Sequence, residues 1–202
     1  DKVRISETAW KTGGSKMFVK VGEQVPVSEL VQGIIVDSGN DATIALSEYV
    51  AGSEQSFVEM MNLQAQRLGM NSTHFEDADG LPSNEHYTTA SDLAILTRAL
   101  INHFPQYYHY FSEKWFTYAG IRQPNRNRLL WRYENADGLK TGHTEDAGYC
   151  LISSALQPSD NMRLITVVLG APSDEERSSD SIKLLTYGFR FFETTMLYDA
   201  NT

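Results

Sequence analysis

The stretch DGLKTGHTEDAGYCLISSA, which runs from Asp137 to Ala155, carries the pattern that decides the fold. Two short runs within it, Leu139–Thr144 and Gly148–Leu156, are rich in β-branched or aromatic residues and are separated by turn-forming residues. A third run of the same kind follows at Met162–Gly170, and another precedes them at Lys114–Gly120. Short runs separated by turns are typical of neighbouring antiparallel strands. The pattern therefore predicts an antiparallel sheet.

Helical patterns lie on both sides of this sheet region. Apolar residues recur at helical spacing in four upstream segments: Ser28–Val36, Asp41–Gly52, Glu54–Gly69 and Ser91–Phe104. Residues 71–90 are a loop rich in turn-forming residues, and residues 3–21 carry strand and turn signals. Downstream, Ser173 and Glu176 match the capping box that opens a long helix. We therefore predict an α+β fold, with one antiparallel sheet covered by helices and a helical subdomain.

Composition narrows the classes of function. The 202 residues are 41% hydrophobic and 21% charged, which is ordinary for a globular domain. The formal net charge of −9 argues against a nucleic-acid partner, because phosphate binding needs a basic patch. Cys150 is the single cysteine, so no internal disulfide and no Cys/His zinc spacing exists. We expect no metal and no cofactor.

Two tripeptides carry the chemistry. Ser38-Gly39-Asn40 lies at a break between two predicted helices, and Lys140-Thr141-Gly142 follows it on a predicted strand. A hydroxyl and an amide at a helix junction suit proton relay and substrate orientation, while a strand lysine suits binding of a substrate carboxylate. A second Lys-Thr-Gly, Lys11–Gly13, precedes Ser38, and we interpret it as coincidence. Each tripeptide alone also fits a simple turn. The order of the two tripeptides and the sequence around them therefore decide between a turn and an active-site motif.

The flanking sequence is distinctive over most of the chain. The distinctive stretches are GIIVDSGNDATIALSEYVAGS (33–53), LGMNSTHFEDADGL (68–81), GIRQPNRNRLLW (120–131), NADGLKTGHTEDAGYCLISSA (135–155), MRLITVVLGAPSDEER (162–177) and LLTYGFRFFE (184–193). Together they resemble the D-alanyl-D-alanine carboxypeptidases of the penicillin-binding protein 5 type, peptidase family S11. The resemblance implies a β-lactamase/transpeptidase-like fold. It also implies a serine peptidase that removes the terminal D-alanine from peptidoglycan stem pentapeptides through an acyl-enzyme and is acylated by β-lactam antibiotics.

The resemblance also assigns expected roles to residues and an expected location. It implies catalytic roles for Ser38, Asn40 and Lys140. It implies substrate-binding roles for a second set: Thr141, Gly142, His143, Arg126 and Arg177. Asp79, Gly80 and Leu81 match a loop beside the family's site and are weaker candidates. For the two arginines, a surface salt bridge remains an equal alternative. The family lies in the periplasm, attached to the outer face of the inner membrane by a C-terminal anchor that this sequence lacks.

One family motif is absent from the printed sequence. No lysine in it has a serine three residues earlier, so the S-x-x-K motif of nucleophile and base is missing. We therefore expect a partial peptidase domain whose N-terminal nucleophile segment lies before Asp1. Its expected parts are a mainly helical region, about 22–113, and a region of strands and a packing helix, about 114–195. Residues 196–202 would begin a linker to an absent second domain.

Two alternative functions stay open. A serine β-lactamase would carry a deacylating carboxylate in the loop between the two tripeptides. Glu76 and Glu85 lie in that interval, but neither sits in such a motif. A non-catalytic peptidoglycan-binding homologue would retain the cleft without the nucleophile. Intact second and third motifs favour the carboxypeptidase.

Overall fold

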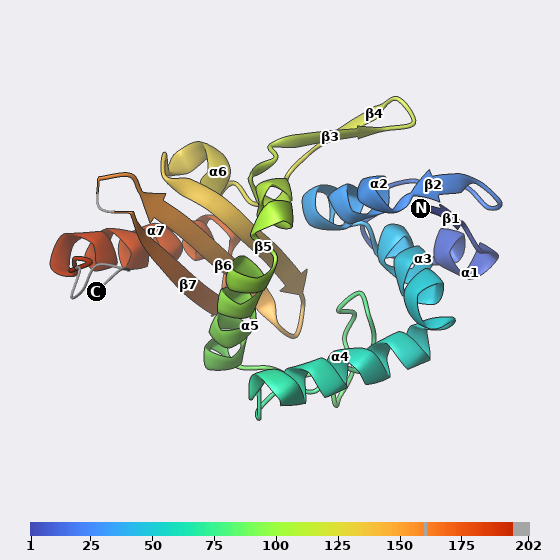
Figure 1. The fold of residues 1–202 in the computed structure, drawn as a ribbon, viewed down its shortest axis with the longest axis horizontal. Coiled ribbons are helices and arrows are strands. Elements are labelled where there is room, and N and C mark those ends of the chain that lie inside the picture. The colour runs from blue at the N-terminus through green and yellow to red at the C-terminus, as the bar shows by residue number, and fades with distance from the viewer. Residues whose placement is uncertain (160, 196–202) are drawn as a thin grey trace, which may run out of the picture.

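A three-stranded antiparallel sheet forms one side of the molecule (Figure 1). In this computed structural model, which describes residues 1–159 and 161–195, the strand order is β5-β6-β7. The strands are β5 (Ala136–Thr144), β6 (Gly148–Gln157) and β7 (Met162–Ala171). The register pairs Lys140 of β5 with Ile152 of β6. The strand predictions around the quoted stretch are confirmed.

Helices pack against both faces of this sheet (Figure 1). Helix α7 (Asp174–Phe191) contacts β6 and β7, and α5 (Ala90–His103) contacts β7 from the opposite face. The 3-10 helix η2 (Pro105–Ser112) contacts β5. The Ser173 hydroxyl accepts a hydrogen bond from the Glu176 N–H at 3.1 Å, as expected for the predicted cap. The predicted α+β class is confirmed.

The helical part precedes the sheet in the chain. It contains α2 (Val27–Gln32), the π-helical turn η1 (Gly33–Asp37), α3 (Asn40–Ala51) and α4 (Glu54–Leu68). We predicted one helix over Ser28–Val36, but its second half is the π-helical turn. The Ser38 N–H donates to the Gly33 carbonyl and closes this wider turn, and the Gly39 N–H donates to the same carbonyl at 3.0 Å. The turn ends at Ser38, which has the left-handed conformation (φ 57°, ψ 40°).

Four short elements were not predicted: α1 (Glu7–Lys11), β2 (Gln24–Pro26), β4 (Ile121–Pro124) and α6 (Leu129–Arg132). Residues 3–21 were expected to be strands and turns, yet α1 forms there after β1 (Lys2–Arg4). The Ser6 hydroxyl accepts from the Ala9 N–H at 2.9 Å, and this cap stabilises the single turn. The predicted strand Lys114–Gly120 is shorter, as β3 (Trp115–Tyr118). Its predicted place in the same sheet as the other strands was wrong, because it pairs with β4 in a separate two-stranded sheet. The remaining elements are β2, which pairs with β1, and α6.

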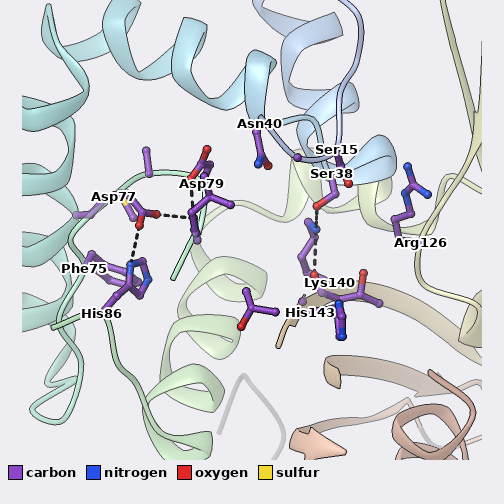
Figure 2. A pocket seen from close by; sticks show the side chains of 18 of the residues that line it. Ser15, Ser38, Asn40, Phe75, Asp77, Asp79, His86, Arg126, Lys140 and His143 are labelled. Atoms are coloured by element: carbon purple, nitrogen blue, oxygen red, sulfur yellow. Dashed lines mark hydrogen bonds and ion pairs between the residues drawn. The ribbon is translucent and has the colours of Figure 1, made fainter. Parts of the chain in front are cut away.

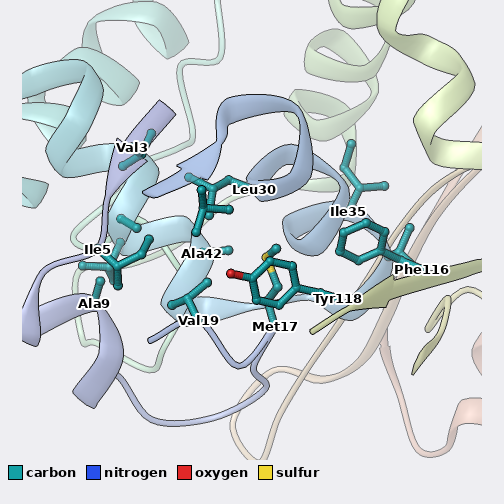
Figure 3. Packing of buried hydrophobic residues seen from close by; sticks show 14 residues of the cluster. Val3, Ile5, Ala9, Met17, Val19, Leu30, Ile35, Ala42, Phe116 and Tyr118 are labelled. Atoms are coloured by element: carbon teal, nitrogen blue, oxygen red, sulfur yellow. The ribbon is translucent and has the colours of Figure 1, made fainter. Parts of the chain in front are cut away.

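Two apolar clusters hold these elements together. The larger is drawn from β1, residues 17–19, α2, η1, α3 and β3 (Figure 3). Met17 and Leu30 are fully buried in it, and Phe116 and Tyr118 of β3 join it. The β3–β4 hairpin therefore packs on the helical part, although it follows that part in sequence. The smaller cluster joins Leu185 of α7 to the sheet.

Within the described residues, no helix is long and apolar enough to cross a membrane. The predicted linker, residues 196–202, lies outside the described residues.

Candidate active site

A cavity of about 570 Å³ opens between the helical part and β5. Its lining contains every candidate that the sequence singled out: Ser38, Asn40, Asp79, Gly80, Leu81, Arg126, Lys140, Thr141, Gly142, His143 and Arg177. Figure 2 shows Ser38 and Lys140 pointing toward each other, with Asp77 and Asp79 across the cavity from Lys140. The fold therefore brings together residues from distant parts of the chain.

The Ser38–Lys140 contact is the centre of the cavity. Lys140 Nζ donates to Ser38 Oγ at 2.8 Å and to the Thr141 carbonyl at 3.1 Å. The left-handed backbone at Ser38 turns its hydroxyl out of the π-helical turn toward β5. Burial of the amine lowers the pKa of Lys140 to about 8, and the positive charges of Arg126 and Arg177 add to this effect. Lys140 is thus a cation that loses its proton easily beside a serine hydroxyl.

Asn40 and the chain before α2 form the helical wall of the cavity, which we define as Gly14, Ser15, Ser38 and Asn40. Asn40 is buried; its Nδ2 donates to the Gly13 carbonyl at 3.0 Å, and its backbone N–H donates to the Ser15 carbonyl at 2.9 Å. Gly14 has φ +77°, and a Cβ there would stand 2.5 Å from Asn40 Nδ2. Only glycine suits that position. The sequence marked Gly14 as a turn but did not place it at the site.

Asp41 holds this wall together from behind. Its carboxylate accepts from the backbone N–H groups of Met17 and Phe18 at 2.8 Å each, and from Val19 at 3.2 Å. Residues 17–19 therefore dock onto the start of α3, where Gly39 leaves room for the Met17 backbone. Lys11 of the first Lys-Thr-Gly copy lies on α1 and pairs with Glu7 at an exposed position. Lys11 does not line the cavity, whereas Gly14 and Ser15, which follow that copy, do line it.

The sheet wall consists of Lys140–Thr144 with Arg126 and Arg177. Arg177 is buried, donates to the carbonyls of Gly142 at 2.9 Å and Cys150 at 3.2 Å, and pairs with Asp174 at 2.5 Å. Arg177 therefore makes an ion pair and also lines the cavity, although the ion pair is buried and does not lie on the surface. The ring of His143 lies on that of Tyr149, with centroids 4.0 Å apart. This wall gathers positive charge along one edge of the sheet.

Arg126 reaches the cavity from the segment after β4. It is exposed, and its Nε donates to the Asp37 carbonyl at 3.4 Å. Asp37, the residue before Ser38, is only 1% exposed, and its Oδ1 has no hydrogen-bond partner. Burial raises the pKa of Asp37 to about 7, with Arg126 opposing that rise and Asp41 adding to it. No sequence pattern indicated that this aspartate would be buried.

The acidic loop, Asp77–Leu81, lies across the cavity from the sheet wall (Figure 2). Asp77 accepts from the Gly80 N–H at 2.5 Å and pairs with His86 at 3.3 Å. Burial, and then the negative charge of Asp77, raise the pKa of Asp79 to about 6. Within the part of the chain that the structure describes, no three His, Cys, Asp or Glu side chains group so as to hold a metal ion.

The comparisons with known proteins agree with this geometry. The model of the D-alanyl-D-alanine carboxypeptidase family, Peptidase_S11, matches residues 1–173. The chain belongs to this family. D-alanyl-D-alanine carboxypeptidase DacC of Escherichia coli is 51% identical over 201 residues, which cover 96% of this chain and 50% of the relative. The chain thus spans about half the length of these curated relatives.

Solved structures show the same architecture. Penicillin-binding protein 5 of Haemophilus influenzae superposes with a TM-score of 0.95 at 46% identity, covering all of this chain and 60% of that one. The Streptomyces K15 DD-transpeptidase superposes with a TM-score of 0.88 at 28% identity, covering 94% of this chain and 79% of that one. The expected β-lactamase/transpeptidase-like fold and the resemblance to the penicillin-binding protein 5 type are confirmed.

Proposed function

We propose that this chain supplies part of the active site of a serine D,D-carboxypeptidase. The enzyme removes the terminal D-alanine from peptidoglycan stem pentapeptides through an acyl-enzyme, and β-lactam antibiotics acylate the same serine. The observation that carries the proposal is the 2.8 Å contact between Lys140 Nζ and Ser38 Oγ in a cavity with a cationic wall. The names of the relatives support it, because they are D-alanyl-D-alanine carboxypeptidases.

Each residue has a proposed role in that reaction. Ser38 and Lys140 relay the proton between the nucleophile and the leaving amine, since each reaches the other by a hydrogen bond. Asn40 holds the amide of the bound peptide. Thr141, Gly142 and His143 on the edge of β5 bind the extended peptide backbone. Arg126 and Arg177 attract the terminal carboxylate and raise its local concentration.

The proposal places the nucleophile outside the printed sequence. These residues contain no S-x-x-K, so the attacking serine and its lysine belong to another segment of the full-length protein. A cell-wall peptidase of this kind works outside the cytoplasm, and we propose the periplasm, with attachment to the outer face of the inner membrane. The formal net charge of −9 disfavours nucleic acid as a partner.

A fluorescent penicillin tests the function. The full-length protein is labelled, digested and mapped by mass spectrometry, beside the 202-residue chain as matched control. We expect the label on a serine outside these residues and none on the 202-residue chain. A full-length protein that takes no label would overturn the proposal and favour a non-catalytic peptidoglycan-binding homologue. Rapid turnover of penicillin, with peptides ending in D-Ala-D-Ala left uncut, would identify a β-lactamase instead.

A further inference from the structure

Asp37 is a buried carboxyl group that the proposed reaction does not use. It is 1% exposed, directly precedes Ser38 and lies in the π-helical turn η1. Its Oδ1 has no hydrogen-bond partner. An ionised carboxylate in such a place leaves charge both buried and poorly paired, which is costly. The geometry therefore favours the neutral acid, and burial raises the pKa of Asp37 to about 7.

A short polar network connects Asp37 to the cavity. Arg126 Nε donates to the Asp37 carbonyl at 3.4 Å. Arg126 Nη2 lies 3.5 Å from Gln123 Oε1, and Gln123 Nε2 donates to the Lys16 carbonyl at 2.9 Å. Gln123 thus links Arg126 to the backbone of Lys16. Arg126 is also the member of this network that lines the cavity.

The neighbouring charges fix the direction of the effect. Elements α2, α3, β3, β4 and η2 pack against η1. Among their groups, Arg126 after β4 favours the ionised form of Asp37, and Asp41 of α3 disfavours it. The other titratable side chains on these elements are Glu29, Glu48, Tyr49, Tyr107, Tyr108, His109, Tyr110, Tyr118 and Arg122. Arg126 is therefore the cation that responds to a proton lost from Asp37.

We propose that Asp37 is a positioning residue that sets how strongly Arg126 attracts a ligand carboxylate, by gaining or losing a proton. When Asp37 is neutral, the Arg126 guanidinium is available to a carboxylate in the cavity. When Asp37 is ionised, it draws the guanidinium into an internal ion pair. The inference rests on the proposed function, in which the carboxylate end of a peptide faces the sheet wall. It predicts weaker binding of that carboxylate as pH rises through about 7.

Asp37→Asn tests the inference, because it fixes a neutral side chain of the same shape. KM for a peptide ending in D-Ala-D-Ala is measured with the full-length protein from about pH 5.5 to pH 8. At the acid end both proteins carry a neutral residue 37, so their KM values should agree. At the alkaline end the wild-type KM should be up to about fivefold higher, which is the most that an ion pair between the exposed Arg126 and a ligand carboxylate contributes. Because both proteins contain Lys140, the ratio of their KM values at each pH removes the effect of its titration.

A double-mutant cycle and a carboxamide ligand supply the controls. In an Arg126→Gln background, Asp37→Asn should no longer change KM at any pH, because the responding cation is gone. The same peptide with its terminal carboxylate amidated, measured as a competitive inhibitor, should bind the two proteins alike at each pH. A KM ratio that is constant across pH in the wild-type background would overturn the inference. A ratio that still changes without Arg126 would overturn it as well.

A direct titration keeps the inference testable if Asp37→Asn does not fold. The carbon-13 shift of the Asp37 carboxyl is followed by NMR in the wild-type protein, and it should titrate near pH 7. A midpoint near 4, the ordinary value for aspartate, would contradict the inference without reference to catalysis. If the protein hydrolyses no peptide, the proposed function fails. The dissociation constant of the peptide then replaces KM and decides the inference on its own.

Discussion

The helical wall and the sheet wall of the cavity are held in place by different forces. Behind the helical wall, the Asp41 carboxylate binds backbone N–H groups of residues 17–19, and the wall residue Asn40 is itself buried. On the sheet wall, Lys140 and Arg177 are placed by strand register and by charge. Hydrogen bonds from backbone N–H groups to Asp41 hold the helical wall in place, whereas charged side chains line the sheet wall. Substitutions at the two walls should therefore have different effects. Changes behind the helical wall should cost stability, and changes on the sheet wall should cost activity.

Lys140→Ala should have the largest effect on activity. It removes the cation that hydrogen-bonds Ser38 at 2.8 Å, and a positioned proton-transfer group contributes about 10²–10⁴-fold to a rate. The second-order rate of acylation by a fluorescent penicillin, measured on the full-length protein, should fall by about that factor. Stability should hold or rise, because a cation that burial disfavours is removed.

Lys11→Ala is the matched control, since it alters the lysine of the other Lys-Thr-Gly copy. Lys11 makes one exposed ion pair with Glu7, so its loss should leave both acylation and stability unchanged. Equal losses of acylation rate in the two variants would mean that neither tripeptide forms the site. A Lys140→Ala protein that acylates at the wild-type rate would remove Lys140 from the mechanism.

Asp41→Ala should have the largest effect on stability. It leaves the buried N–H groups of Met17 and Val19 without a partner, and each unsatisfied buried donor costs about 1–3 kcal/mol. We expect urea denaturation to show a loss of about 3 kcal/mol in the free energy of unfolding. Asp180→Ala, which breaks an exposed pair with Lys183, should cost less than about 0.5 kcal/mol. Similar losses in both variants would mean that the Asp41 carboxylate stabilises the fold no more than an exposed ion pair does.

The sequence predicted the sheet wall better than the helical wall. Runs of β-branched or aromatic residues between turns are local signals, so the predicted bounds of β5 and β6 lie close to the observed ones, and Lys140 was assigned to a strand. The order of the two tripeptides also predicted that Ser38 and Lys140 share a site. The proposed roles of these residues remain predictions.

What escaped prediction depends on contacts between distant segments. The π-helical turn before Ser38, and the docking of residues 17–19 on Asp41, involve partners that local patterns do not reveal. Gly14 lines the cavity because a Cβ there would press on Asn40, which turn signals alone could not show. Elements on several sides bury Asp37. A single acidic residue in an apolar run does not itself indicate that it will be buried.

The pH dependence of acylation should give the smallest of these effects and tests the sheet wall by charge alone. Burial, with Arg126 and Arg177, lowers the pKa of Lys140 from its ordinary 10.5 to about 8, so its amine is charged below pH 8 and neutral above it. If the charged form acts, the acylation rate is full below about pH 7 and falls about tenfold by about pH 9. Arg126→Gln removes one of the two positive charges that oppose protonation of Lys140, so it should move this falling limb to higher pH. A limb that stays in place would show that another group titrates there, and that the sheet wall does not act through the charge of Lys140.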